Sequence, residues 1–176
     1  MKLGVICDGI SRDLSHALRV MDEFGLDYAE LQFVWDKEVG DHDASEIAQI
    51  KELLDTHNKP VSCLSRHIFA GLTTASKAGD KDHTRHMDSL KCVIEMAHQL
   101  NCPLVRIMTS KKEQILWGTN GAEHWNVAKG AWDNLPPLIA PAVDLARTEG
   151  VTLVVETGNG TMVNSNYTAV KLIDAL

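Results

Sequence analysis

Five short runs rich in valine, isoleucine and leucine recur along the chain, and stretches with helical periodicity separate them. The runs lie at residues 3–7, 28–33, 61–64, 104–108 and 151–155. They are nearly continuous rather than alternating, which is typical of parallel strands that crossover helices bury on both faces. The chain is therefore predicted to be an α/β protein whose parallel strands are joined by right-handed crossovers.

The first two helical segments carry recognisable start and stop signals. Residues 12–24 follow Ser11, which is expected to be the N-cap, and precede Gly25, which is expected to end the helix. The second segment starts at Asp43, and Glu46 three residues later completes a capping box. Both helices are predicted to pack an apolar stripe on the sheet.

The remaining helical segments are longer or incomplete. The third spans about residues 82–100 and shows clear helical spacing of its apolar side chains. The fourth runs to Gly150 and is expected to break or kink at Pro136 and Pro137, because proline lacks the N–H that a helix interior uses. A fifth helix begins after Ser165.

This element order fits two architectures, a doubly wound open sheet and a barrel. Long loops after the third and fourth strands, and polar residues at most strand C-termini, favour the active face of a barrel. Strands that neighbour each other in chain order would support the barrel, whereas a 3-2-1-4-5 order would support the open sheet.

Composition and charge narrow the class of partner. The formal net charge of -7 opposes binding to nucleic acid or to anionic membranes, so a small metabolite is the expected partner. Cys7, Cys63, Cys92 and Cys102 are scattered without a C-x-x-C spacing, which indicates a reducing compartment. No signal peptide or membrane span is recognisable, and a cytoplasmic location is predicted. Whether the protein forms a homo-oligomer is left open.

The last apolar run ends in Glu156, followed by a Gly-Asn-Gly turn at residues 158–160. A carboxylate at the C-terminal end of a parallel strand lies at the mouth of the sheet, where it can hold a divalent cation or take a proton from carbon. Alternatively, Glu156 only caps the N–H groups of the loop. A dinucleotide-binding turn is disfavoured, because Val163 replaces the third glycine and Glu156 would repel a pyrophosphate.

Other polar and aromatic residues are candidates for contact with substrate. His67 follows the third strand and can polarise a sugar hydroxyl or carbonyl, although a plain loop histidine is the commoner case. Glu30 and Arg106 are charges inside apolar runs, so they either pair across the interior or contact substrate. The full set of predicted substrate-binding residues is His67, Arg106, Trp35, Asn159 and Trp117.

The four tryptophans and one histidine pair have competing interpretations. Trp35, Trp117, Trp125 and Trp132 can stack on a sugar or simply pack loops on the barrel, and residues 117–121 resemble a mobile lid. His83 and His86 have a spacing that can chelate zinc, but they lie among charged residues. A solvated helix start is the favoured interpretation of that pair.

The segments LGVICDGIS, DYAELQFVW, VSCLSRHIFAG, LVRIMTS and VTLVVETGNGTMVNS together resemble the xylose isomerase-like TIM-barrel family of sugar isomerases and epimerases. The resemblance implies a partial (β/α)₈ TIM barrel, with residues 1–176 as one domain holding the first five β/α units. It implies that Glu156 ligates a divalent metal ion (Mn, Mg, Co or Zn) and acts as an acid or base. The family's other ligands, an Asp, a His and a second Glu, come from later strands that this sequence lacks.

The resemblance implies a metal-dependent isomerase or epimerase that transfers a proton next to a carbonyl of a sugar. Alternatives are a lyase or dehydratase acting on a cyclitol or keto-acid, a metal-dependent endonuclease, and a non-enzymatic sugar-binding module. The negative charge argues against the endonuclease. A fragment of a longer reading frame is expected, and a half-barrel completed by another chain is the alternative.

Overall fold

The computed structural model describes residues 1–112 and 121–176, and it describes side chains outside residues 121–129. Its main sheet has five parallel strands in the order β1-β2-β5-β6-β7, which is also their order along the chain. This order confirms the α/β class and is the one expected of a barrel. The strands are β1 (Gly4–Ile6), β2 (Tyr28–Leu31), β5 (Val61–Ile68), β6 (Leu104–Ile107) and β7 (Thr152–Val155).

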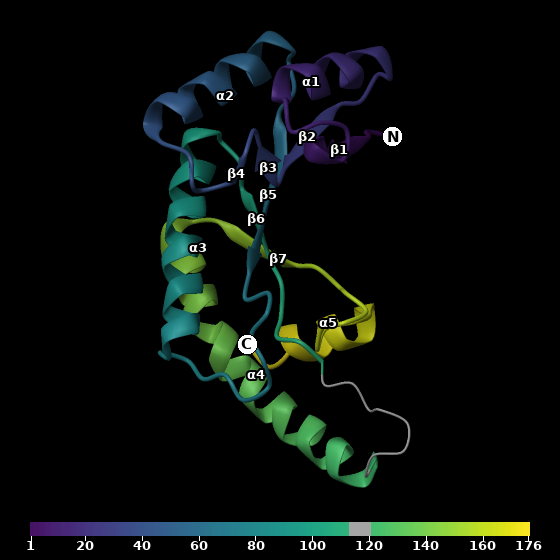
Figure 1. Cartoon of the computed structure of the whole chain (residues 1–176), viewed down its shortest axis with the longest axis vertical. Helices are drawn as coiled ribbons and strands as arrows, with labels where there is room; N and C mark the ends of the chain where they lie inside the picture. The colour runs from purple at the N-terminus through teal and green to yellow at the C-terminus, as the bar shows by residue number, and fades with distance from the viewer. Residues whose placement is uncertain (113–120) are drawn as a thin grey trace.

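Helices surround this sheet in the order that the sequence predicts. Figure 1 shows the first four helices forming an outer arc around the strands, with the inner side of the arc left open. The helices are α1 (Leu14–Glu23), α2 (Ala44–Thr56), α3 (Lys81–Gln99), α4 (Gly121–Glu149) and α5 (Asn166–Ile173), and a short 3₁₀ turn, η1 (Cys7–Gly9), follows β1. No helix in the described part of the chain is long and apolar enough to span a membrane.

The helix ends agree with the predicted caps except at α1. Asp13, not Ser11, is the N-cap of α1, because its carboxylate accepts the N–H of His16. Ser11 instead accepts the N–H of Asp13 and so lies before the cap. At α2 the capping box of Asp43 and Glu46 is confirmed.

The prolines of α4 do not interrupt it. Pro136, Pro137 and Pro141 all lie inside one helix of 29 residues, so of the predicted break or kink the break is wrong. Each proline removes one helical hydrogen bond. Buried neighbours on the same helix, Leu135, Leu138 and Ile139, pack into the core and hold the segment helical.

A small antiparallel hairpin, β3 (Phe33–Val34) and β4 (Lys37–Glu38), follows β2 where the sequence predicts a longer strand. Its turn includes Trp35, whose φ of 54° is unusual for a residue with a side chain. The N–H of Trp35 donates to the carbonyl of Arg12 at 2.7 Å, which ties the turn to the segment before α1. The hairpin lies beyond the C-terminal end of β2, at the mouth of the sheet.

The two faces of the sheet differ in chemistry. The face under α1 to α4, here called the outer face, is apolar and has side chains no more than 3% exposed at Ala29, Leu31, Leu64, Val105 and Ile107. Burying one such Leu or Ile stabilises the fold by about 1.5–3 kcal/mol. Alternate residues of the same strands point to the opposite side, the inner face.

Candidate active site on the inner face

An open pocket of about 320 Å³ lies on the inner face of the sheet. All five parallel strands or their ends contribute to it, and its charged residues come from three different strands. The lining residues are Ile6, Glu30, Cys63, Ser65, Leu104, Arg106, Val154, Val155 and Glu156. Because side chains alternate between the two faces of each parallel strand, the polar residues of several strands come together in this pocket.

A chain of polar contacts crosses this pocket from β2 to β7. Arg106 is 7% exposed, and its Nη1 donates to Oε2 of Glu156 at 2.5 Å. Its Nη2 donates to the carbonyl of Ser65 at 3.1 Å, and the Ser65 hydroxyl donates to Glu30. The predicted ion pair between Glu30 and Arg106 is therefore wrong: Arg106 pairs with Glu156, and Ser65 stands between Arg106 and Glu30.

The strand register explains this pairing. Arg106 is opposite Val154 in the β6–β7 ladder, and Glu156 is two residues further on, so both side chains lie on the inner face. The N–H of Glu156 donates to the carbonyl of Ile107 at 3.1 Å, which continues the ladder to this residue. The Glu156 side chain is 44% exposed, and Oε1 makes no hydrogen bond within the described residues.

The pocket also contains a thiol and an unpaired donor. Burial raises the pKa of Cys63 to about 11, so this thiol stays protonated near neutral pH and is no nucleophile. The buried Nε of Arg106 has no hydrogen-bond partner among the described residues. Leaving that buried N–H unpaired costs about 1–3 kcal/mol.

The turn after Glu156 is a tight turn, as the glycines suggest. The N–H of Thr161 donates to the carbonyl of Gly158 at 3.0 Å, and the N–H of Gly158 donates to that of Val163. Asn159 at the tip is exposed and lies outside the pocket lining. Its predicted contact with substrate remains a prediction.

His67 lies near the end of β5, in a segment where the strand register shifts between Ser65 and Ile68. Neighbouring residues of a regular strand point to opposite faces, but Arg66 and His67 both contact the segment of Glu38 to Asp41. Nδ1 of His67 lies 2.6 Å from Oε1 of Glu38. Glu38 is not predicted from the sequence, because its position depends on a hairpin and a bulge that leave no clear pattern there.

The tryptophans do not line the pocket in the described part of the chain. Trp35 is half-buried against the core, with its ring edge-on to His42 at a centroid distance of 6.0 Å. Trp132 is half-buried under the ammonium group of Lys171, 4.2 Å from its ring centroid. Trp117 lies outside the described residues, as does the side chain of Trp125.

The histidine pair of α3 is neither a solvated helix start nor a metal site. His83 is 3% exposed, its Nε2 faces the carbonyl of Leu138 at 2.9 Å, and its ring stacks on Phe69. Nδ1 of His86 accepts the N–H of Phe69 at 3.1 Å. The charged residues around the pair suggest exposure to solvent. In the structure, however, α4 and the end of β5 cover one face of the first turn of α3.

The metal ion that the resemblance implies needs more ligands than the described residues bring together. Within residues 1–112 and 121–176, no group of three or more His, Cys, Asp or Glu side chains is placed to hold an ion. Glu156 offers one carboxylate oxygen, and Arg106 holds the other. By themselves, these residues do not form a metal centre.

Residues 18–176 match the family model described as xylose isomerase-like TIM barrel. The chain belongs to this family. No curated protein matches the chain at the sequence level. The five consecutive parallel strands and their outer helices are therefore part of a (β/α)₈ barrel.

Solved structures of the same fold are longer than this chain. A structure of the IOLI protein with a bound zinc atom has a TM-score of 0.66 at 21% identity, covering 99% of this chain and 58% of its own. D-allulose 3-epimerase from Methylomonas sp., in complex with D-allulose, has a TM-score of 0.63 at 13% identity, and the match covers 99% of this chain and 58% of that protein. A probable 3-DHS dehydratase from Bacillus anthracis has a TM-score of 0.68 at 10% identity, and the match covers 99% of this chain and 59% of that protein. The chain thus spans about three fifths of the length of these proteins.

Proposed function

We propose that this chain is part of a sugar isomerase or epimerase that transfers a proton next to a carbonyl, with Glu156 as its catalytic carboxylate. The observation that carries the proposal is that the two carboxylate oxygens of Glu156, at the end of β7, have different surroundings. One of its oxygens is held by a buried arginine, and the other is free within the described residues beside an open pocket. A fixed carboxylate with one available oxygen can accept a proton from a bound substrate.

In this proposal Arg106 orients the carboxylate and Glu156 transfers the proton. Arg106 is rigid, because it is buried and donates to two oxygens, so it fixes the orientation of the Glu156 carboxylate. Its Nε is buried and has no hydrogen-bond partner within the described residues. Glu156 then holds or releases a proton through Oε1.

The proposal includes a divalent cation, Mn, Mg, Co or Zn, with most of its ligands expected outside this chain. Glu156 would supply one ligand in place of its contact with Arg106, because Oε1 is the oxygen left for the proton. Such an ion would polarise the carbonyl of the substrate. The zinc atom in the IOLI structure is consistent with this part of the proposal. Small sugars are the proposed substrates, in line with the D-allulose bound to a protein of the same fold.

The test follows exchange of the hydrogen next to the carbonyl in D₂O by proton NMR, for a panel of ketoses with Mn²⁺ or Mg²⁺. It uses the complete gene product that contains this chain. Glu156→Gln is expected to lower the exchange rate by about 10²–10⁴-fold, the usual contribution of a general acid or base. Glu52→Gln, on the exposed side of α2, is the matched control and is expected to leave the rate unchanged.

Three outcomes would contradict the proposal. The first is exchange and metal affinity that are unaltered in Glu156→Gln. The second is an absence of exchange with every ketose in the panel. The third is loss of water from the substrate without exchange, which would assign the site to a dehydratase instead.

A further inference from the structure

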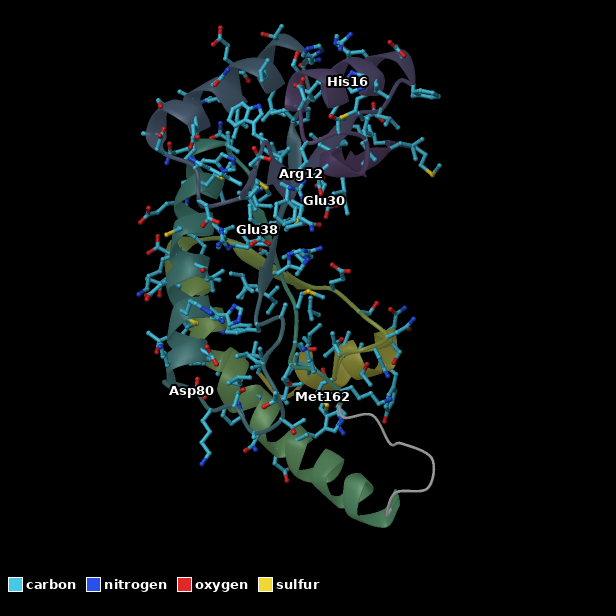
Figure 2. The ribbon with its side chains drawn as sticks, in the orientation of Figure 1. Arg12, His16, Glu30, Glu38, Asp80 and Met162 are labelled. Atoms are coloured by element: carbon cyan, nitrogen blue, oxygen red, sulfur yellow. The ribbon has the colours of Figure 1, made fainter. Side chains whose placement is uncertain are left out.

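The end of β5 and the β3–β4 hairpin form a second polar cluster that the proposed role of Glu156 does not use. Figure 2 shows Glu38 and Glu30 in the region where the hairpin meets the sheet. The cluster consists of Glu38 and its partners Arg66 and His67, with Gln32 on the far side of the imidazole. His67 is 42% exposed, so one side of its ring is open to a ligand.

Glu38 is held by three donors and is only 18% exposed. Its Oε1 accepts both the backbone N–H of His67, at 3.0 Å, and the ring Nδ1, at 2.6 Å. Its Oε2 faces Nε of Arg66 at 3.5 Å. Arg66 is itself anchored to the carbonyl of Val39 and to Asp41.

These contacts determine which ring nitrogen of His67 carries the proton. An ionised carboxylate only accepts hydrogen bonds, so the nitrogen that faces Glu38 must be Nδ1–H. In the neutral ring, Nε2 then carries the lone pair. The side-chain nitrogen of Gln32 lies 3.5 Å from Nε2 and, being a donor, agrees with that assignment.

We propose that Glu38 is a positioning residue that keeps His67 in the Nδ1–H form, so that Nε2 accepts a hydrogen bond and then a proton from a substrate hydroxyl. In that step the O–H bond breaks, its electron pair stays on oxygen, and an Nε2–H bond forms. The resulting imidazolium is stabilised by the adjacent carboxylate of Glu38. The role in proton transfer rests on the proposed function, whereas the orientation of the ring does not.

The same geometry selects the kind of group that His67 recognises. With a lone pair at Nε2, neutral His67 cannot donate to a carbonyl oxygen through that atom, and it requires a hydrogen-bond donor, which in a sugar is a hydroxyl group. The Gln32 contact is long for a hydrogen bond, so a ligand hydroxyl can replace it at little cost. A polyol with a hydroxyl directed at the end of β5 is therefore the substrate class that fits.

The test is a ¹⁵N NMR measurement of the His67 ring at a pH where it is neutral, together with kinetics of the complete gene product. Wild type is expected to show a protonated Nδ1 and an unprotonated Nε2. Glu38→Ala is expected to shift the population toward Nε2–H and to lower kcat by about 10- to 100-fold with little change in KM. Asp41→Asn, which removes another partner of Arg66 without touching His67, is the control and should leave the tautomer unchanged.

The outcomes separate the parts of this proposal. An Nε2–H tautomer in wild type, or an unchanged tautomer in Glu38→Ala, would overturn the positioning role of Glu38. If the variant does not fold, the wild-type spectrum alone still tests that role. A shifted tautomer with unchanged kcat would overturn the role in proton transfer. If no substrate shows exchange, the proposed function fails, and the wild-type tautomer still tests the positioning by Glu38.

Discussion

The outer and inner faces of the same five strands are chemically unlike. On the outer face Leu64 packs among apolar side chains, whereas its neighbour Ser65 on the inner face bonds to Glu30 and Arg106. Both residues are 0% exposed. Burial alone therefore does not distinguish them, and the alternation of side chains along one strand separates residues that stabilise the barrel from residues that shape its site.

The largest expected effect tests that separation directly. Leu64→Ala removes part of a packed side chain on the central strand and should reduce the free energy of unfolding by about 3 kcal/mol. Ser65→Ala removes one hydrogen bond to a half-buried carboxylate and should cost about 1 kcal/mol. Urea denaturation measures both variants. Equal losses would show that the inner face is as much a packed core as the outer face.

The tight packing of the outer side is expected to extend beyond the strands, to the contact between Gly40 and α3. Gly40 has a φ of +91°, and an added Cβ would lie 2.7 Å from Cγ2 of Val93 on α3. Gly25 has a φ of +64°, with nothing within 4 Å of such an atom. Gly40→Ala should cost about 2–3 kcal/mol from strain and overlap together, and Gly25→Ala about 1 kcal/mol from strain alone.

Thermal or urea unfolding of these two glycine variants gives the comparison. Equal losses would mean that α3 moves away from the loop at no cost. The close packing of the outer side would then end at the strands.

On the inner face, the Arg106–Glu156 pair should respond asymmetrically. Glu156→Leu leaves a buried guanidinium without its carboxylate and should cost about 2 kcal/mol. Arg106→Met leaves a carboxylate that is 44% exposed, so water replaces its partner and the loss should be about 1 kcal/mol. A larger loss for Arg106→Met would indicate that the hydrogen bonds of the guanidinium, including the one to the carbonyl of Ser65, stabilise the inner face more than the Glu156 carboxylate does.

The outer face was easier to predict from the sequence than the inner one. Continuous apolar runs and capping residues such as Asp43 determine strands and helices locally, and these were recovered with their order. Glu156 is a candidate in the sequence because it directly follows an apolar run, and the structure places it beside the inner-face pocket. Glu38 was not found, since its contact with His67 depends on a bulge in β5 and on a turn that places Trp35 at positive φ. Such contacts between distant segments have no periodic signal in a single sequence.

The smallest expected effect concerns a polar group within the outer layer, His86 of α3. Its burial, followed by the charge of Arg85, lowers its pKa below the ordinary value of 6.5, and its neutral Nδ1 accepts the N–H of Phe69. As the pH falls below about 6.5, the unfolded chain binds this proton before the folded one, so stability is lost until the folded pKa is reached. His86→Asn can still accept from Phe69 but does not titrate, so it should lose less stability than wild type between pH 7.5 and 5.5. All other ionisable groups are the same in both proteins, and an identical loss in the two would show that His86 is protonated without any effect on the Phe69 backbone.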